Sequence, residues 1–332
     1  LHQDVHSFPT RRSSDLSSKK AAVERYLATL EGQNAVRASL ISQVASNYYT
    51  LLALDNKLTL IRKYIDLQRQ AEKIAEIQKE ADSDTELAVE KFKAELAKAR
   101  SQEFVLKQEI TECENALNLL LGRYPTPIQR DAKQLLNEDV KMVVIGLPSN
   151  LLSHRPDIRQ AEHELAAAHW DVETARKAFL PSVNISATLG LEAFNPTYLT
   201  RMPKSLAYSV VGGLTAPLIN RKAIEANFQQ ADAAQLQALY EYDKTLLTAY
   251  SEVCTLLSKH KNLVAYYALK EEEVKTLEHS VEVSRQLYMN GRATYLDVLG
   301  AERDALDAQM ELLETRQQQL SCVVDLYRSL GE

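Results

Sequence analysis

Residues 147–191 read LPSNLLSHRPDIRQAEHELAAAHWDVETARKAFLPSVNISATLGL, and two periodicities meet within this stretch. Apolar side chains recur every three or four residues up to Phe179, which is typical of a helix that packs lengthwise against partners. Pro156 suits the first helical turn, where its missing N–H is not needed, and Pro181 ends the helix. From Pro181 onward, apolar positions alternate with small polar ones, which predicts an extended segment.

A second alternating segment, residues 207–218, follows the first one, residues 181–191. Each has about the ten residues that a tilted strand needs to cross a bilayer. One face is apolar and the other is small and polar, which is typical of a barrel with a water-filled lumen. On this hypothesis, the residues expected to face lipid are Val183, Ile185, Leu189, Val210 and Leu214. The pattern by itself favours an ordinary half-buried hairpin of a soluble protein, because the barrel signal of single strands is weak.

Very long helices are predicted on both sides of this stretch. Residues 19–80 contain no proline and one glycine, and the sequence ADSD at 81–84 then predicts a hairpin tip. A return helix runs to about Leu121, and Gly122 is suited to end it. A second very long helix is predicted at 223–289, with a return helix at 294–330 and a tip turn formed by Asn290, Gly291 and Arg292. Such rods cannot be buried in a globular domain, so they must pair with one another.

The two predicted helix pairs form an internal repeat. Cys113 and Cys322 lie 209 residues apart, as do Gly122 and Gly331. This offset is far longer than the period of a solenoid. It indicates a duplicated domain built of two helices and a strand pair.

Several strings in the chain resemble one known family. LPSNLLSHRPDIRQAE, AFLPSVNISATLG and APLINRKAI occur in that order, followed by LYMNGRATYLDVLGAERDAL and DLYRSLG. Together they resemble the outer-membrane efflux channel family, the TolC-like and OprM-like outer-membrane factors of tripartite efflux systems. The resemblance covers nearly everything after about residue 17. It implies a mainly α fold with a β-hairpin, in which long antiparallel helical hairpins of a TolC-like α-barrel join two strands of a trimeric outer-membrane β-barrel.

The resemblance also implies a division of the chain. The expected parts are a first-repeat long helical hairpin at 17–123, an equatorial linker at 124–150, a helix that opens the second repeat at 151–180, a transmembrane β-hairpin at 181–219, and a second-repeat long helical hairpin at 220–332.

The first residues are expected to be foreign to the protein. The string SFPTRRSSDL at 7–16 resembles the translation of a common sequencing adapter, which predicts that residues 1–16 are an artefact. The alternative is a disordered terminus rich in serine and arginine. On the first interpretation, the chain is N-terminally truncated, and its signal peptide, lipid anchor and first strand pair are missing.

Composition and motifs argue against several function classes. The net charge is −6, so no basic surface indicates nucleic-acid binding. The three cysteines, Cys113, Cys254 and Cys322, are too few for a disulfide framework or a metal cluster. His163-Glu164 lacks the second histidine of a zinc-protease helix, and no phosphate-binding glycine loop is present. We therefore expect no enzymatic activity, no cofactor and no metal.

One cluster of charges lies at the start of the predicted helix after Pro156. Arg155, Asp157, Arg159 and Glu162 could bind a ligand, or they could form an ion-pair network that fixes the position of this helix. The structural interpretation is favoured, because such networks usually set register.

The second helical tip is the better functional candidate. In the family that the chain resembles, this position lines the closed periplasmic end. Leu296, Asp297 and Arg303 match the family pattern, whereas Gly300 stands where an aspartate is common. The remaining gate candidates are Tyr295 and, at the first tip, Asp82 and Asp84. An alternative role for Asp297 is to complement the helix macrodipole as an N-terminal acid.

These inferences predict a passive exit duct in the outer membrane, with its helical barrel in the periplasm. The resemblance implies a homotrimer in contact with outer-membrane lipid, a periplasmic adaptor and an inner-membrane pump, and no nucleic acid. The alternative is a soluble periplasmic coiled-coil adaptor or interaction protein. That alternative predicts one helical hairpin and a domain rich in Gly and Pro, whereas this sequence predicts two hairpins that flank amphipathic strands. The sequence identifies neither the cargo nor the type of pump.

Overall fold

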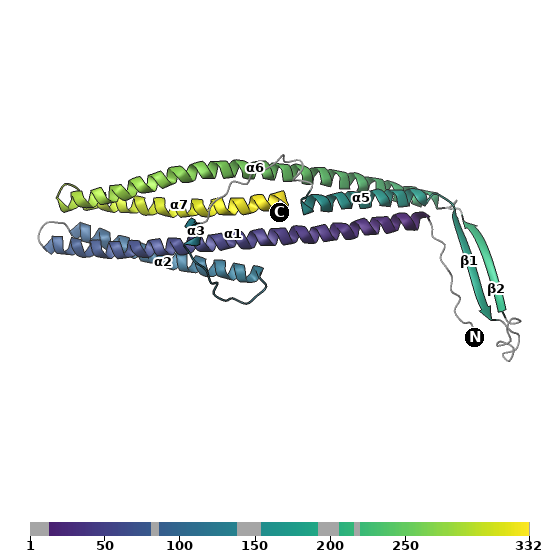
Figure 1. The fold of residues 1–332 in the computed structure, drawn as a ribbon, viewed down its shortest axis with the longest axis horizontal. Helices are drawn as coiled ribbons and strands as arrows, with labels where there is room; N and C mark the ends of the chain where they lie inside the picture. The colour runs from purple at the N-terminus through teal and green to yellow at the C-terminus, as the bar shows by residue number, and fades with distance from the viewer. Residues whose placement is uncertain (1–12, 81–85, 138–153, 192–205, 216–219, 332) are drawn as a thin grey trace. The chain divides into compact units, whose positions relative to one another are not determined.

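The computed structural model describes residues 13–80, 86–137, 154–191, 206–215 and 220–331 (Figure 1). Its elements are α1 (Ser13–Glu80), α2 (Glu86–Leu120), α3 (Gln134–Asn137), α5 (Pro156–Lys177), β1 (Ser182–Leu191), β2 (Leu206–Thr215), α6 (Arg221–Met289) and α7 (Tyr295–Leu330). The long helices and both strands appear where periodicity predicts them, although α1 begins at Ser13, four residues before the predicted start of the first hairpin at residue 17. No helix among the described residues is both long enough and apolar enough to span a membrane.

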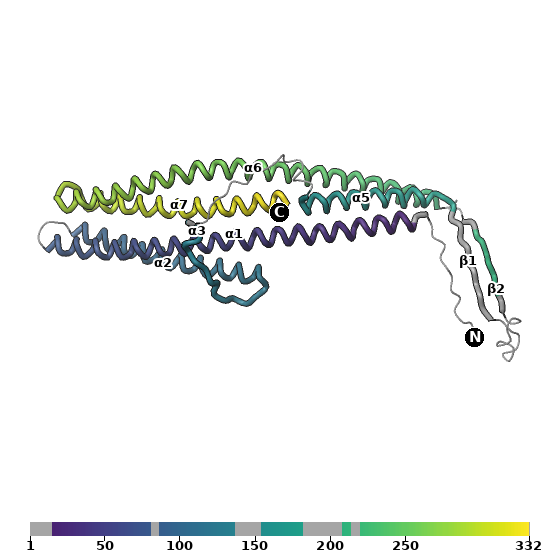
Figure 2. The backbone as a smooth tube through the Cα atoms, viewed as in Figure 1, coloured from purple at the N-terminus to yellow at the C-terminus, as the bar shows by residue number. Residues whose placement is uncertain are grey.

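The chain divides into two compact units. The first contains residues 1–35 and 153–248, and the second contains residues 36–152 and 249–332. Helices α1 and α6 each contribute to both units, and Figure 2 traces each of them as a continuous helix. The units are described separately below.

In the first unit, β1 and β2 form an antiparallel hairpin. Its register pairs Ser182 with Thr215 and Leu191 with Leu206. The side chain of Val210, one of the five residues predicted to face lipid, is exposed. The side chains of the other four lie outside the described residues: Val183, Ile185, Leu189 and Leu214. Their contact with lipid stays a prediction.

Helix α5 packs against the first part of α1 through a seam of small residues. Ser17, Ala21 and Ala28 of α1 are almost fully buried. A Cβ atom at Gly32 would lie 3.0 Å from Oε1 of Gln160 on α5, which is tighter than ordinary van der Waals contact. Small side chains let the two backbones approach closely, which explains why the alanine-rich pattern after Pro156 predicts lengthwise packing.

Polar contacts flank this seam on both sides. Nζ of Lys177 donates to Oγ of Ser17 at 2.6 Å. Nδ1 of His163 lies 2.8 Å from a carboxylate oxygen of Glu24. Nζ of Lys20 stands 4.1 Å from the ring centroid of Trp170. The seam is therefore held in register along the length of α5.

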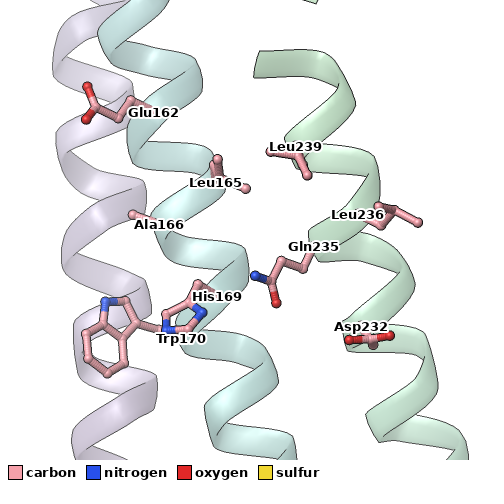
Figure 3. A pocket seen from close by; sticks show the side chains of 9 residues that line it. All are labelled: Glu162, Leu165, Ala166, His169, Trp170, Asp232, Gln235, Leu236 and Leu239. Carbon is pink, nitrogen blue, oxygen red and sulfur yellow. The ribbon is translucent and has the colours of Figure 1, made fainter. Parts of the chain in front are cut away.

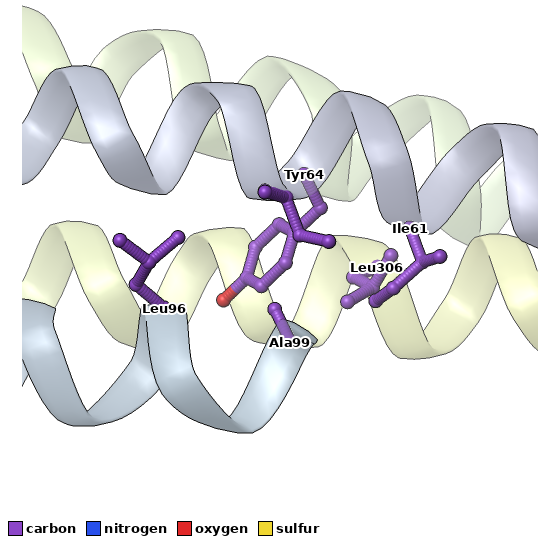
Figure 4. Close-up of a cluster of buried hydrophobic side chains, with 6 residues drawn as sticks. Ile61, Tyr64, Leu96, Ala99 and Leu306 are labelled. Atoms are coloured by element: carbon purple, nitrogen blue, oxygen red, sulfur yellow. The ribbon is translucent and has the colours of Figure 1, made fainter. Parts of the chain in front are cut away.

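In the second unit, the core joins residues of the two hairpins. Figure 4 shows one cluster, in which Ile61 and Tyr64 of α1 meet Leu96 and Ala99 of α2 and Leu306 of α7. Each of these side chains is less than a tenth exposed. The pairing of long rods predicted from the apolar seams is thus observed in this unit.

A linker segment, residues 121–137, fastens the first hairpin to α7. Leu135 of α3 is fully buried, with Leu52 and Ala53 of α1 and with Leu313 and Leu320 of α7. Its carbonyl oxygen accepts a hydrogen bond of 3.1 Å from Nε of Arg316. Leu135 therefore anchors the linker between two helices that are far apart in sequence.

A buried arginine strengthens the same linker segment. Arg130 donates to the carboxylates of Asp55 on α1 and Glu114 on α2. Hydrogen bonds to Asp55 and Glu114, opposed by burial, raise the pKa of Arg130. The guanidinium therefore remains charged and ties the linker to both helices of the first hairpin.

The predicted internal repeat is confirmed in the packing of the second unit. Sγ of Cys113 donates to the carbonyl oxygen of Asn47, and Sγ of Cys322 donates to that of Leu256, so both acceptors lie 66 residues before their cysteine. Gly122 and Gly331 follow α2 and α7 with φ angles of 65° and 85°. The two hairpins thus place matching residues in matching environments.

Two glycines should respond oppositely to substitution by alanine. Gly122 has a positive φ angle, so Gly122→Ala should destabilise the end of α2 by about 1–2 kcal/mol. Gly300 lies inside α7 with open space where a Cβ atom would be, so Gly300→Ala should stabilise α7 by about 0.5–1 kcal/mol. Thermal unfolding followed by circular dichroism at helical wavelengths would test this. Shifts of the same sign for both variants would contradict it.

Candidate functional site

The second helical tip is a tight turn between α6 and α7. It contains the three predicted turn residues, Asn290, Gly291 and Arg292. Gly291 has a φ angle of 67°, which only glycine adopts readily. The N–H of Arg292 donates to the carbonyl oxygen of Leu287 at 2.8 Å, which closes the end of α6.

Asp297 begins α7 as part of a capping box with Thr294. The N–H of Thr294 donates to Oδ2 of Asp297 at 2.8 Å, and the N–H of Asp297 donates to Oγ1 of Thr294 at 3.4 Å. Hydrogen bonds from Thr294 hold the pKa of Asp297 below its usual range. This geometry supports a role at the start of the helix, and the role of Asp297 in a gate stays a prediction.

The other gate candidates differ in their surroundings. Tyr295 packs against Phe92 of α2, with ring centroids 6.2 Å apart. Leu296 is 53% exposed, and Arg303 is exposed without an ion pair to any described residue. Gly300 is half-buried. The two candidates at the first tip lie outside the described residues: Asp82 and Asp84.

The structure reveals a buried polar cluster that the sequence prediction missed. We call Gln68, Arg285 and Glu302 the Glu302 cluster. Nε2 of Gln68 on α1 donates to Oε2 of Glu302 on α7 at 2.6 Å. Nε and Nη2 of Arg285 on α6 donate to the other carboxylate oxygen of Glu302, at 2.8 and 2.5 Å. Three helices therefore meet at one carboxylate.

The Glu302 cluster is withdrawn from solvent. Gln68 is 0% exposed and Glu302 is 6% exposed. A sequence signal for it exists, because Gln68 continues the apolar spacing of Ile61 and Ile65, where a polar residue is unexpected. Glu302 gives no such signal, because charged residues are common along α7.

Two further polar contacts lie on either side of this cluster. Toward the tip, the hydroxyl of Tyr288 on α6 donates to Oε1 of Gln78 on α1. Away from the tip, the hydroxyl of Tyr64 donates to Glu95 on α2 at 3.3 Å. Burial, followed by the charges of Glu95 and Glu302, raises the pKa of Tyr64, so this hydroxyl remains a donor.

The four charges predicted to form one network near Pro156 do not do so. Arg155 is buried and donates to both carboxylate oxygens of Asp157, at 3.0 and 2.7 Å. Arg159 instead lies 3.5 Å from Glu31 of α1. Residues two apart on a helix face different directions, so Arg159 cannot join the pair that precedes it. Although burial opposes it, hydrogen bonding to Arg155 lowers the pKa of Asp157.

Glu162, the fourth of these charges, lines a groove in the first unit. The groove lies between α5 and α6, with a volume of about 610 Å³, and Figure 3 shows its lining. Leu165, Leu236 and Leu239 form apolar walls, and the rings of His169 and Trp170 meet edge to face at 5.6 Å. Within the described residues, no group of three or more His, Cys, Asp or Glu could hold a metal ion.

Comparison with known proteins identifies the family. The family described as "Outer membrane efflux protein" matches residues 13–123 and 147–332. The solvent efflux pump outer membrane protein SrpC of Pseudomonas putida is 31% identical over 318 residues, which cover 95% of this chain and 67% of that protein. The cation efflux system protein CusC of Escherichia coli (strain K12) is 29% identical over 315 residues, which cover 94% of this chain and 68% of that protein.

Solved structures agree with the sequence comparison. A crystal structure of CusC has a TM-score of 0.90 at 27% identity, and the match covers 98% of this chain and 76% of that chain. The outer membrane protein VceC of Vibrio cholerae shares the fold, with a TM-score of 0.86 at 23% identity and coverage of 98% and 78%. These findings confirm the predicted fold class and the predicted outer-membrane efflux channel, and they give no support to a soluble adaptor. The family is one of channels rather than enzymes, and this chain belongs to the outer membrane efflux protein family.

Proposed function

We propose that this chain forms, as a homotrimer, the outer-membrane exit duct of a tripartite efflux system. The single observation that carries the proposal is the family match over both helical hairpins and the strand pair between them. The duct conducts passively and catalyses no bond chemistry. A periplasmic adaptor and an inner-membrane pump supply direction and energy, while β1 and β2 contribute to a barrel in contact with outer-membrane lipid.

Exposed apolar side chains support the homotrimer. Along α6 alone, the exposed residues include Leu236, Tyr240, Leu247, Tyr250 and Leu269. Soluble monomers rarely leave so much apolar surface uncovered. Neighbouring copies of the same long helix pairs would bury this surface in a closed ring.

The cargo is a small molecule or an ion whose class stays open. SrpC is named for solvent efflux and CusC for cation efflux, while a third relative, OpmQ of Pseudomonas aeruginosa, is named for pyoverdine export. Related ducts thus serve chemically different cargoes. A passive polar lumen accounts for this variety better than a specific binding site does.

A complementation experiment tests the proposal. The gene for the full-length protein is deleted and restored in the source bacterium, and accumulation of a set of efflux dyes and metal ions is measured with the native pump and adaptor present. Deletion should raise accumulation of at least one compound, and restoration should reverse it, with the protein in the outer-membrane fraction. A protein found only in the soluble periplasm, with accumulation unchanged, would contradict the proposal.

We further propose that the second tip lines a constriction, with Leu296, Asp297 and Arg303 as its exposed residues. Gly300 follows Asp297 by three residues, so a carboxylate at 300 would lie on the same face of α7. No described atom would obstruct a Cβ there. Gly300→Asp should therefore add a second acidic ring to the trimer.

The expected result of Gly300→Asp is stronger block by multivalent cations. Three added charges close to a symmetry axis should lower the blocking concentration roughly tenfold or more, because each factor of ten requires only about 1.4 kcal/mol. Single-channel current in planar bilayers under increasing cation concentration measures this. Gly300→Asn is the matched control, because it adds similar volume without charge. Equal block in both variants would place the constriction elsewhere.

A further inference from the structure

The inference concerns Gln68, which joins α1 to the second helical hairpin inside the second unit. Its side chain is 0% exposed. Its Nε2 donates to Glu302 at 2.6 Å, while its Oε1 is buried without a hydrogen-bond partner in the described structure. Reversing the amide would leave the NH2 group unpaired and set a carbonyl against a carboxylate. In either orientation, one polar atom of Gln68 stays unsatisfied.

A buried polar atom without a partner costs free energy that hydration would restore. The cost at Gln68 exists only while α1 packs against α7 at this level. If the two helices separated, water would reach Oε1. The packed arrangement is therefore weaker at Gln68 than a fully paired contact would be.

The contacts near the tip divide into two kinds. Those within the second hairpin include ion pairs: Arg285 of α6 binds Glu302 of α7, and Lys270 of α6 lies 2.6 Å from Glu311 of α7. Toward the tip from Gln68, the polar contacts given between α1 and the hairpin use neutral groups on α1, namely the amides of Gln68 and Gln78. The hairpin is thus more firmly bound to itself than to α1.

Farther from the tip, α1 and α7 are joined by charge. Lys57 of α1 pairs with Glu314 of α7. Gln68 lies eleven residues beyond Lys57 toward the tip, which is roughly 16 Å along a helix. An ionic tie below and neutral ties above define a joint between these two levels.

We propose that Gln68 sets the strength with which the tip half of the second hairpin is held against α1, and so sets the balance between a closed and an open duct. This inference rests on the proposed function. Glu302 and Arg285 move with the hairpin as a pair, and Gln68 is the positioning residue on the other side of the joint. Because Gln68 carries no charge, the joint holds the tip closed yet can be released.

Two substitutions at Gln68 in the full-length protein should move the balance in opposite directions. Gln68→Lys places a cation beside the Glu302 carboxylate and removes the unpaired carbonyl, so open probability in planar bilayers should fall roughly fivefold or more. Gln68→Glu places two carboxylates side by side, so open probability should rise by a similar factor. Hydrogen exchange around residues 64–72 should slow in the first variant and quicken in the second.

Gln70 provides matched controls, because it lies two residues away and is exposed. Gln70→Lys and Gln70→Glu make the same charge changes and should leave open probability within twofold of the wild type. If the Gln68 variants match their Gln70 counterparts while the wild type conducts normally, the inference fails and the exit duct stands. If the assembled wild type does not conduct, the proposed function itself fails. Should Gln68→Glu not assemble, Gln68→Lys still decides, and an unchanged open probability overturns the inference.

Discussion

Replacing Arg285 with alanine should loosen the second helical tip more than any other single change near it. The substitution leaves the carboxylate of Glu302, whose side chain is 5% exposed, with the amide of Gln68 as its remaining donor among the contacts described above. Removing one partner of a buried ion pair typically costs about 3–5 kcal/mol, because the other charge stays buried and uncompensated. Protection of nearby amides against hydrogen exchange should therefore fall by roughly two to three orders of magnitude.

Hydrogen exchange measured by mass spectrometry on the full-length protein tests this expectation. The loss of protection should concentrate in peptides that cover residues 64–72 and 298–306. Arg62→Ala is the matched control, since Arg62 is 55% exposed and pairs with Glu103 at 3.1 Å. An exposed pair of this kind is worth about 0–1 kcal/mol, so its loss should change protection less than tenfold. Equal effects of the two variants would show that the Glu302 cluster does not stabilise the tip.

The second large effect is expected at Leu135, in the linker segment. Leu135→Ala should cost about 2–5 kcal/mol, because it leaves a cavity among buried residues of α1 and α7. The linker should then detach locally, while its hydrogen bonds through Arg130 hold its earlier part to the first hairpin. Hydrogen exchange and limited proteolysis of residues 121–137 should both increase by at least tenfold.

Leu136 supplies the control for this prediction. It is the next residue along α3 and is 50% exposed, so Leu136→Ala should stay within about 0.5 kcal/mol of the wild type. The comparison separates burial at one position from any general sensitivity of the linker. Similar proteolysis of the Leu135 and Leu136 variants would contradict the anchoring role of Leu135.

Much of the fold could be predicted from sequence because its elements are long and regular. A period of 3.6 over sixty or more residues leaves little ambiguity, and Pro156 and Pro181 mark where α5 begins and the strands follow. The repeat was equally accessible, since Cys113 and Cys322 occupy matching positions that need the same small buried side chain. Regularity, rather than any single motif, carries this information.

The contacts between helices were less accessible. Nearness in sequence suggested one network of Arg155, Asp157, Arg159 and Glu162, whereas helical geometry sends Arg159 toward Glu31 on α1. Local spacing shows which residues share a face of one helix, but it does not show which residue of another helix meets them. Partners more than a hundred residues away require the register between two rods.

The same limit explains why the Glu302 cluster was missed. Gln68 and Glu302 are 234 residues apart, and each alone resembles an ordinary polar residue on a long helix. The only local signal is that Gln68 occupies a position in an apolar seam. Polar residues at seam positions deserve the same scrutiny as charged motifs, because burial makes their pairing energetically consequential.

The central claim is that the chain belongs to a passive duct through the outer membrane, and single-channel recording of the purified full-length protein in planar bilayers tests it most directly. We expect discrete conductance steps from a trimer without pump, adaptor or nucleotide, with the closed state dominant in the wild type and less so after Arg285→Ala. An assembled trimer that inserts into the bilayer and yet gives no conductance steps, in the wild type and in the Arg285 variant alike, would contradict the claim.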